Sequence, residues 1–160
     1  MAKGAVEGDS LSWLLCRAGR RLCALPLEHV VETMRPLPIE RIAGSPRLVL
    51  GLSVVRGSPI PVVDIGALFS EPETGPQRIV TVRTGGRVVG LAVEEVVGVR
   101  IIEPDRLEDL PPLLRDAAGE VVSAIGRLDS ELLLFLSATR LLPLGTLQDA
   151  RANGTGQGTT

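Results

Sequence analysis

The sequence predicts a mainly β protein made of two small five-stranded antiparallel barrels that share a seam, with a few short helices. Three observations support this prediction. Short runs rich in Val, Ile and Leu recur along the chain, residues typical of turns separate them, and the pattern repeats in order. Closing a sheet removes its exposed edges, and a unit of about 65 residues is marginal alone, so the two units should pack together.

The predicted strands are apolar runs bounded by Gly, Pro, Asp or Ser. They cover Ser12–Arg17, Arg21–Leu25, Gly51–Val55, Ser58–Val63, Arg78–Thr84, Arg87–Val93, Val97–Ile102, Val121–Leu128 and Glu131–Leu136. Helical spacing of apolar residues occurs only in Pro26–Met34, and short helices fit Ile65–Phe69 and Ser137–Leu142. Asp64 is interpreted as the cap of the turn that begins at Ile65.

The segment Leu50–Ile65 is the most informative hairpin. Two apolar runs flank Arg56-Gly57-Ser58, which is typical of strand, tight turn and strand. Pro59 and Pro61 remove backbone donors from the second run, so we expect that strand to lie at an edge or to be irregular. Arg56 at the tip is either a solvated turn residue or a recognition group.

The chain repeats itself weakly. Gly19–Pro38 aligns with Gly85–Pro104 at a constant offset, so that Leu25 meets Leu91 and Pro38 meets Pro104. Further on the offset lengthens, and the additional residues of the second copy fall in the Pro-containing segment Glu108–Gly119. Because turn and proline positions are kept, duplication explains the pattern better than chance.

The repeat places the boundary between the two units near residues 69–78. The polar segments 1–10 and 147–160 are rich in small residues and are predicted to be flexible tails.

Composition excludes several classes of function. A formal net charge of −2, the lack of Tyr and only three other aromatic residues leave little with which to bind nucleic acid. His29 is the one histidine, and Glu94-Glu95 point to opposite faces of a strand, so neither a catalytic centre nor a metal or cofactor site is expected. The lack of a signal peptide or apolar span favours a cytoplasmic protein.

Cys16 and Cys23 flank a plausible hairpin turn that would place them directly opposite each other. A disulfide is therefore geometrically conceivable. Two reduced, half-buried thiols in a reducing compartment are the favoured interpretation.

Glu32 and Arg56 are charges inserted among apolar residues near predicted strand ends, and the fold could bring them together. They are either an exposed ion pair of little consequence or the polar specificity element of an apolar groove.

With these residues assembled, the chain resembles the CheW family of chemotaxis coupling proteins. The resemblance rests on GRRLCALPLEHVVETMR, SPRLVLGLSVVRGSPIPVVDI, GGRVVGLAVEEVVGVRII and SAIGRLDSELLLFLSATRLL. The most specific element, G-x-x-x-x-R-G-x-x-x-P-V-x-D, is matched by Gly51, Arg56, Gly57, Pro61, Val62 and Asp64.

The resemblance covers residues 11–144, and it implies one domain of two intertwined SH3-like barrels that acts as a non-catalytic adaptor. Its implied partners are the regulatory domain of a CheA-type histidine kinase and the cytoplasmic hairpin tip of chemoreceptors, which would recruit it to receptor arrays. Carried over by position, the partner-binding residues are Val30, Glu32, Gly51 and Arg56 on one barrel, with Gly90, Val96 and Val99 beside the groove between barrels.

Two other functions stay open. A divergent family member could bind only one partner, receptor or kinase, as a competitor or as a scaffold specific to one pathway. A small-molecule-binding barrel is a third candidate, weakened by the shortage of aromatic and convergent polar residues.

Overall fold

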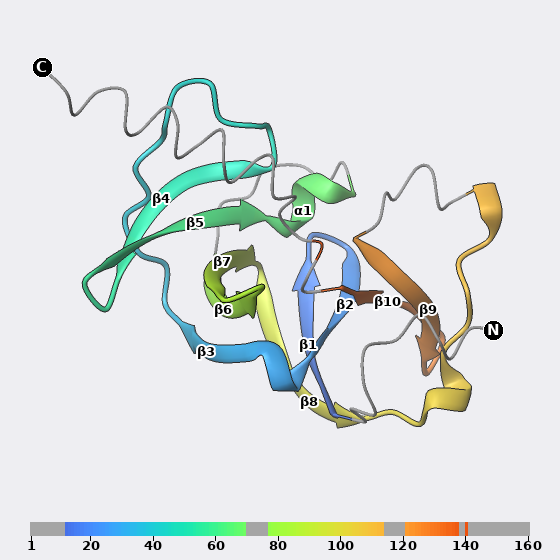
Figure 1. Cartoon of the computed structure of the whole chain (residues 1–160). Coiled ribbons are helices and arrows are strands. Elements are labelled where there is room, and N and C mark those ends of the chain that lie inside the picture. The colour runs from blue at the N-terminus through green and yellow to red at the C-terminus, as the bar shows by residue number, and fades with distance from the viewer. Residues whose placement is uncertain (1–11, 70–76, 114–120, 138–139, 141–160) are drawn as a thin grey trace, which may run out of the picture.

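The computed structural model describes residues 12–69, 77–113, 121–137 and 140, and within them the chain forms ten strands (Figure 1). The strands are β1 (Ser12–Ala18), β2 (Arg21–Pro26), β3 (Val30–Met34), β4 (Val49–Val55), β5 (Ser58–Asp64), β6 (Arg78–Thr84), β7 (Arg87–Val93), β8 (Glu95–Ile101), β9 (Val122–Leu128) and β10 (Glu131–Leu136). Short helical elements also occur within the described ranges, among them the 3-10 turns Leu27–His29 and Pro104–Arg106 and helix α1 (Ile65–Leu68).

The strands form two five-stranded sheets, which confirms the predicted fold class. Sheet A has the order β8-β1-β2-β10-β9, and sheet B has the order β3-β6-β7-β5-β4. Each sheet is mixed rather than wholly antiparallel, because β10 runs parallel to β2 and β5 runs parallel to β7. These parallel pairs join strands from different hairpins, where no tight turn dictates direction.

The two halves of the chain have the same strand register, as the sequence repeat predicts. Cys16 faces Cys23 in the β1–β2 hairpin, and Val82 faces Val89 at the corresponding place in the β6–β7 hairpin. The register shifts also correspond. Strands β3 and β8 shift beside Val31 and Val97, and strands β4 and β9 shift beside Leu50 and Ser123. Duplication therefore extends to the irregularities of the ladders.

The halves exchange their first hairpins. Hairpin β1–β2 belongs to sheet A with β8, β9 and β10, whereas hairpin β6–β7 belongs to sheet B with β3, β4 and β5. The expected boundary near residues 69–78 therefore does not separate the sheets, because that segment joins β5 to β6 within sheet B. The chain crosses between sheets at Leu27–His29 and at Glu94. The proposed tails lie outside the described residues.

The sheets share one continuous apolar core, which we call the seam. It contains side chains from both exchanged hairpins, from β5, β9 and β10, from helix α1 and from the β8–β9 connection: Leu14, Cys16, Ala18, Cys23, Leu25, Val63, Ile65, Val80, Val82, Val89, Leu91, Val93, Leu110, Val122, Leu134 and Leu136. A second cluster fills the other face of sheet A, where Trp13 meets Phe135 edge-to-face with ring centroids 4.7 Å apart.

Two local predictions need correction. Pro26–Met34 does not form a helix, since it divides into the 3-10 turn and strand β3, whose β-branched Val30, Val31 and Thr33 suit an extended chain. For strand β5 the expected edge position is wrong, because β5 lies between β7 and β4. The alternative of irregular pairing holds, since its register with β4 shifts between Val49 and Gly51. Its prolines fit because β7 pairs only with Val62–Asp64, so Pro59 and Pro61 pair with β4 alone.

Helix α1 begins as predicted. The Asp64 carboxylate accepts a hydrogen bond of 3.0 Å from the Gly66 amide, which satisfies a backbone donor of the first turn. The short helix predicted for Ser137–Leu142 lies largely outside the described residues.

Candidate functional site

Arg56 and Glu32 form a bidentate ion pair on the surface of sheet B. Arg56 Nε donates to Glu32 Oε1 at 2.8 Å, and Nη2 donates to Oε2 at 2.7 Å. Arg56 occupies the β4–β5 turn, which lies on the same side of the molecule as β3 (Figure 1). The pair therefore links β3 to the end of β4, and these are the two outer strands of sheet B.

Local structure positions both side chains. Arg56 has φ of 50° and precedes Gly57 with φ of 80°, the left-handed pair that a two-residue hairpin turn requires. Beside the register shift at Val31, the buried Thr81 hydroxyl accepts from the Glu32 amide and donates to the Glu32 carbonyl, each at 3.2 Å. This arrangement holds the backbone of Glu32 on β6.

The pair leaves the guanidinium accessible. The Arg56 side chain is 79% exposed, as the turn predicts, and the Glu32 side chain is 26% exposed. The hydrogen bonds from Arg56 lower the pKa of the Glu32 carboxyl, and the carboxylate in turn raises the pKa of Arg56. Both groups stay charged at neutral pH, and the Nη1 donors of Arg56 are not used by Glu32.

Only one of the two equivalent surfaces carries this pair. In the other half of the repeat, Gly98 corresponds to Glu32 and Asp129, with φ of 56°, corresponds to Arg56. Sheet A has a different bidentate pair, in which Arg17 Nη1 and Nη2 donate to Glu131 at 2.7 and 2.9 Å. The duplicated fold thus has two chemically distinct ends.

Gly51 and Gly90 are buried, although both were predicted to contact partners. A Cβ on Gly51 would lie 2.1 Å from the Glu40 carbonyl oxygen, and Gly51 has φ of 150°. Glu40 and Leu52 exchange two backbone hydrogen bonds at this point, so Gly51 lets the β3–β4 connection close over β4. A Cβ on Gly90 would lie 3.2 Å from the Ile79 side chain. The lack of a side chain at Gly51 and Gly90 therefore allows close packing within sheet B.

Strand β8 forms an apolar edge of sheet A. It pairs with β1 on one side only, and it carries Val99 at 49% exposed. Two neighbours that were not predicted from the sequence extend this surface, Val97 and the 72% exposed Ile101. Their alternation with less apolar positions could have signalled a strand with an exposed apolar face. Val96, by contrast, is half-buried and packs against the seam, as does Val30.

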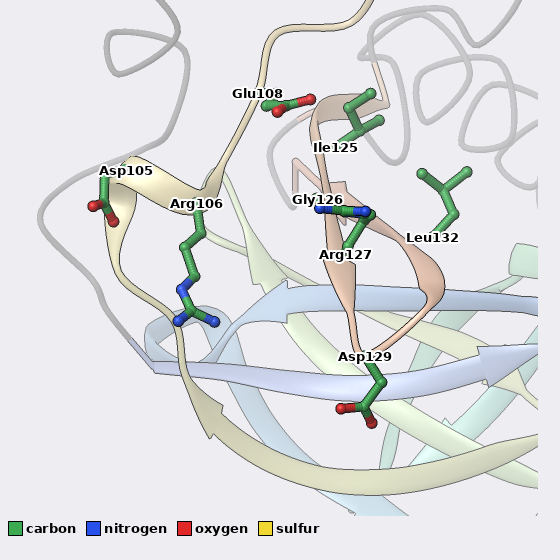
Figure 2. A pocket seen from close by; sticks show the side chains of 8 residues that line it. All are labelled: Asp105, Arg106, Glu108, Ile125, Gly126, Arg127, Asp129 and Leu132. Carbon is green, nitrogen blue, oxygen red and sulfur yellow. The ribbon is translucent and has the colours of Figure 1, made fainter.

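A depression of about 610 Å³ beside β9 was not predicted from sequence (Figure 2). It is lined by Asp105, Arg106, Glu108, Ile125, Gly126, Arg127, Asp129 and Leu132. The 3-10 turn Pro104–Arg106 supplies one wall and the β9–β10 hairpin supplies the other. Because residues 105–108 and the β9–β10 hairpin are separate in sequence, only the folded chain brings their charged side chains together.

Metal-ligand types do not gather in the described ranges, where no group of three or more His, Cys, Asp or Glu residues could hold an ion. His29 is half-buried, and its Nε2 lies 3.5 Å from Glu28 Oε1. None of the described helices is long and apolar enough to cross a membrane.

A duplicated β scaffold with a charged turn at one end and an apolar edge strand at the other has the surface of a protein-interaction module. The chain belongs to the CheW-like domain family, whose model matches residues 12–144.

Known proteins of this family cover most of the chain. The Myxococcus xanthus protein FrzA is 32% identical over 135 residues, which is 79% of this chain and 81% of FrzA. The chemotaxis protein CheW of Klebsiella aerogenes is 24% identical over 145 residues, or 89% of this chain and 87% of that protein. The crystal structure of the scaffolding protein TtCheW from Thermoanaerobacter tengcongensis has the same fold, with a TM-score of 0.75 and 24% identity over 86% of this chain and 95% of that one.

Proposed function

We propose that this protein is a non-catalytic, cytoplasmic adaptor that couples chemoreceptors to a CheA-type histidine kinase. The observation that carries the proposal is the presence of two unlike surfaces on the two sheets. An adaptor needs two binding sites that its partners can occupy at once, and the divergence of the two halves of this duplicated fold supports that role.

The first surface is the turn of sheet B, with Arg56, Glu32 and the 66% exposed Val54. Arginine is enriched among residues that dominate binding energy, and here the ion pair pre-orients it. The unused Nη1 donors suit a carboxylate or a carbonyl oxygen on the partner.

The second surface is the β8 edge, with Val97, Val99 and Ile101. An exposed apolar edge strand can bind an extended segment through its backbone or pack against an apolar helix. Val30, Gly51, Gly90 and Val96 support these surfaces from beneath, since they are buried or half-buried.

The proposal is tested by separate titrations of a kinase regulatory domain and a receptor hairpin with two single variants. Arg56→Asn removes the charge, and asparagine tolerates the positive φ of the turn. Val99→Asp places a charge on the apolar edge. We expect each variant to weaken one partner by roughly thirtyfold and to leave the other nearly unchanged.

Two exposed positions provide matched controls. Arg83→Asn removes an exposed arginine of β6 and Leu132→Asp adds a charge to an exposed apolar site on β10, and neither should change binding. If the wild-type chain binds only one of the two partners, it is a single-partner module. Folded variants that bind both partners with wild-type affinity would refute the assignment of these surfaces.

A further inference from the structure

Cys16 and Cys23 are directly opposed in the β1–β2 hairpin. Ala18 and Arg21 flank its two-residue turn and close it as a hydrogen-bonded pair, and the alternation of the ladder makes Cys16 and Cys23 the next pair of this kind. Such pairs hold their Cα atoms about 5.5 Å apart, within the range that a disulfide spans. Both cysteines are free thiols in this structure.

The two thiols lie on the seam rather than on the surface. Each residue is 1% exposed, and both belong to the core cluster that joins sheet A to sheet B. The equivalent positions in the β6–β7 hairpin are Val82 and Val89, which belong to the same cluster. Valines satisfy the packing there, so the fold itself does not require sulfur at these positions.

We propose that Cys16 and Cys23 form a reversible dithiol–disulfide couple that responds to peroxide when the β1–β2 hairpin loosens from the seam. One thiol loses its proton, the thiolate attacks a peroxide oxygen and the O–O bond breaks, which gives a sulfenic acid and a hydroxide that takes up the released proton to form water. The second thiolate then attacks the sulfenic sulfur, which forms the S–S bond and releases hydroxide that is protonated to water. Two thiols and one hydrogen peroxide thus give one disulfide and two waters.

A disulfide between Cys16 and Cys23 would affect strand β8, which forms the edge of sheet A. Cys16 pairs with Cys23 on one side and with Val96 of β8 on the other, and the β1–β8 register shifts between Leu15 and Cys16. A change in the Cys16 backbone therefore acts where β8 is already irregular and has one neighbouring strand only.

The test treats the folded full-length protein with hydrogen peroxide, then denatures it in an alkylating reagent and digests it with trypsin. Trypsin cuts after Arg17, Arg20 and Arg21, between the two cysteines, so the disulfide appears as two linked peptides. We expect linked peptides that separate on reduction, together with changes in amide hydrogen exchange in β1, β2 and β8.

The control is the double variant Cys16→Val, Cys23→Val, which copies the residues of the equivalent hairpin. It should fold and show no change in hydrogen exchange after peroxide. Cysteines that stay free in the folded protein, at a peroxide dose that links them in the unfolded chain, would overturn the proposal. Disulfides between chains would overturn it too, and linked peptides with unchanged β8 exchange would overturn the coupling to β8.

Discussion

Arg56, at the end of β4, and Glu32, on β3, come from the two outermost strands of one sheet, yet their side chains share two hydrogen bonds of 2.8 and 2.7 Å. No backbone ladder joins β3 to β4 within the described strands, so sheet B must curve for this contact to form. The ion pair is therefore evidence that sheet B curves, and it orients the exposed guanidinium of Arg56.

The carboxyl group of Glu32 should titrate below the ordinary range of glutamate because Arg56 donates two hydrogen bonds to it. A group with a lowered pKa contributes stability above its unfolded pKa and loses it as pH falls through the folded pKa. Carboxyl NMR titration should show the pKa return to its ordinary range in Arg56→Asn. Glu131, paired with Arg17, should keep its lowered pKa in that variant and serves as the internal control. An unchanged Glu32 pKa would contradict the pairing.

Reversing the charge at position 56 should weaken partner binding more than removing it. Arg56→Glu places two carboxylates together at the turn and faces the partner with the wrong sign, whereas Arg56→Asn only deletes a contact. We expect Arg56→Glu to lose roughly tenfold more affinity than Arg56→Asn, by calorimetric titration. Similar losses of affinity for the two variants would show that the charge at position 56 does not contribute to partner binding.

Gly51→Ala should destabilise the protein more than Gly98→Ala. The two glycines have nearly equal φ, 150° and 148°, but a Cβ meets the Glu40 carbonyl at 2.1 Å only at Gly51, while nothing lies within 4 Å at Gly98. Both variants share the backbone strain, so their difference isolates the clash. Urea unfolding should place Gly51→Ala at least ~2 kcal/mol below Gly98→Ala. Equal losses of unfolding free energy would mean that the β3–β4 connection can shift to make room for the new Cβ.

Alkaline pH should destabilise the fold through the two cysteines. Burial raises the pKa of the Cys16 and Cys23 thiols to about 12, so the folded state keeps protons that the unfolded chain releases. Their contribution is complete below the unfolded pKa and is lost as pH rises toward the folded value. The free energy of unfolding should fall by about 2–4 kcal/mol between pH 8 and pH 10.

The sequence makes this measurement unusually direct, since Lys3 is the one lysine and there is no Tyr. The variant Cys16→Val, Cys23→Val removes the remaining side chains that titrate in that window. Its unfolding free energy should stay nearly level from pH 8 to pH 10. An equal decline in variant and wild type would assign the effect to another cause.

The sequence by itself determined the local features of this protein. Alternating apolar residues and Gly, Pro and Asp at the turns define most of the strands, the exposed Arg56 turn, the Asp64 cap and the internal repeat. These features depend on residues close in sequence, where side-chain period and turn chemistry decide the conformation. The helix predicted for Pro26–Met34 was wrong because apolar spacing alone fits a helix there, whereas the β-branched residues and the pairing with β6 favour a strand.

Only the tertiary structure decided which strands pair. Hairpins β1–β2 and β6–β7 have the same register, so nothing local indicates that each joins the sheet of the other half. Pairing between distant segments buries Cys16 and Cys23 on the seam, places β8 at an edge, and brings Glu32 to Arg56. It also buries Gly51 and Gly90, which the family resemblance placed among the partner-binding residues. Burial and pairing between distant segments depend on how the whole chain packs, so short-range sequence patterns do not predict them.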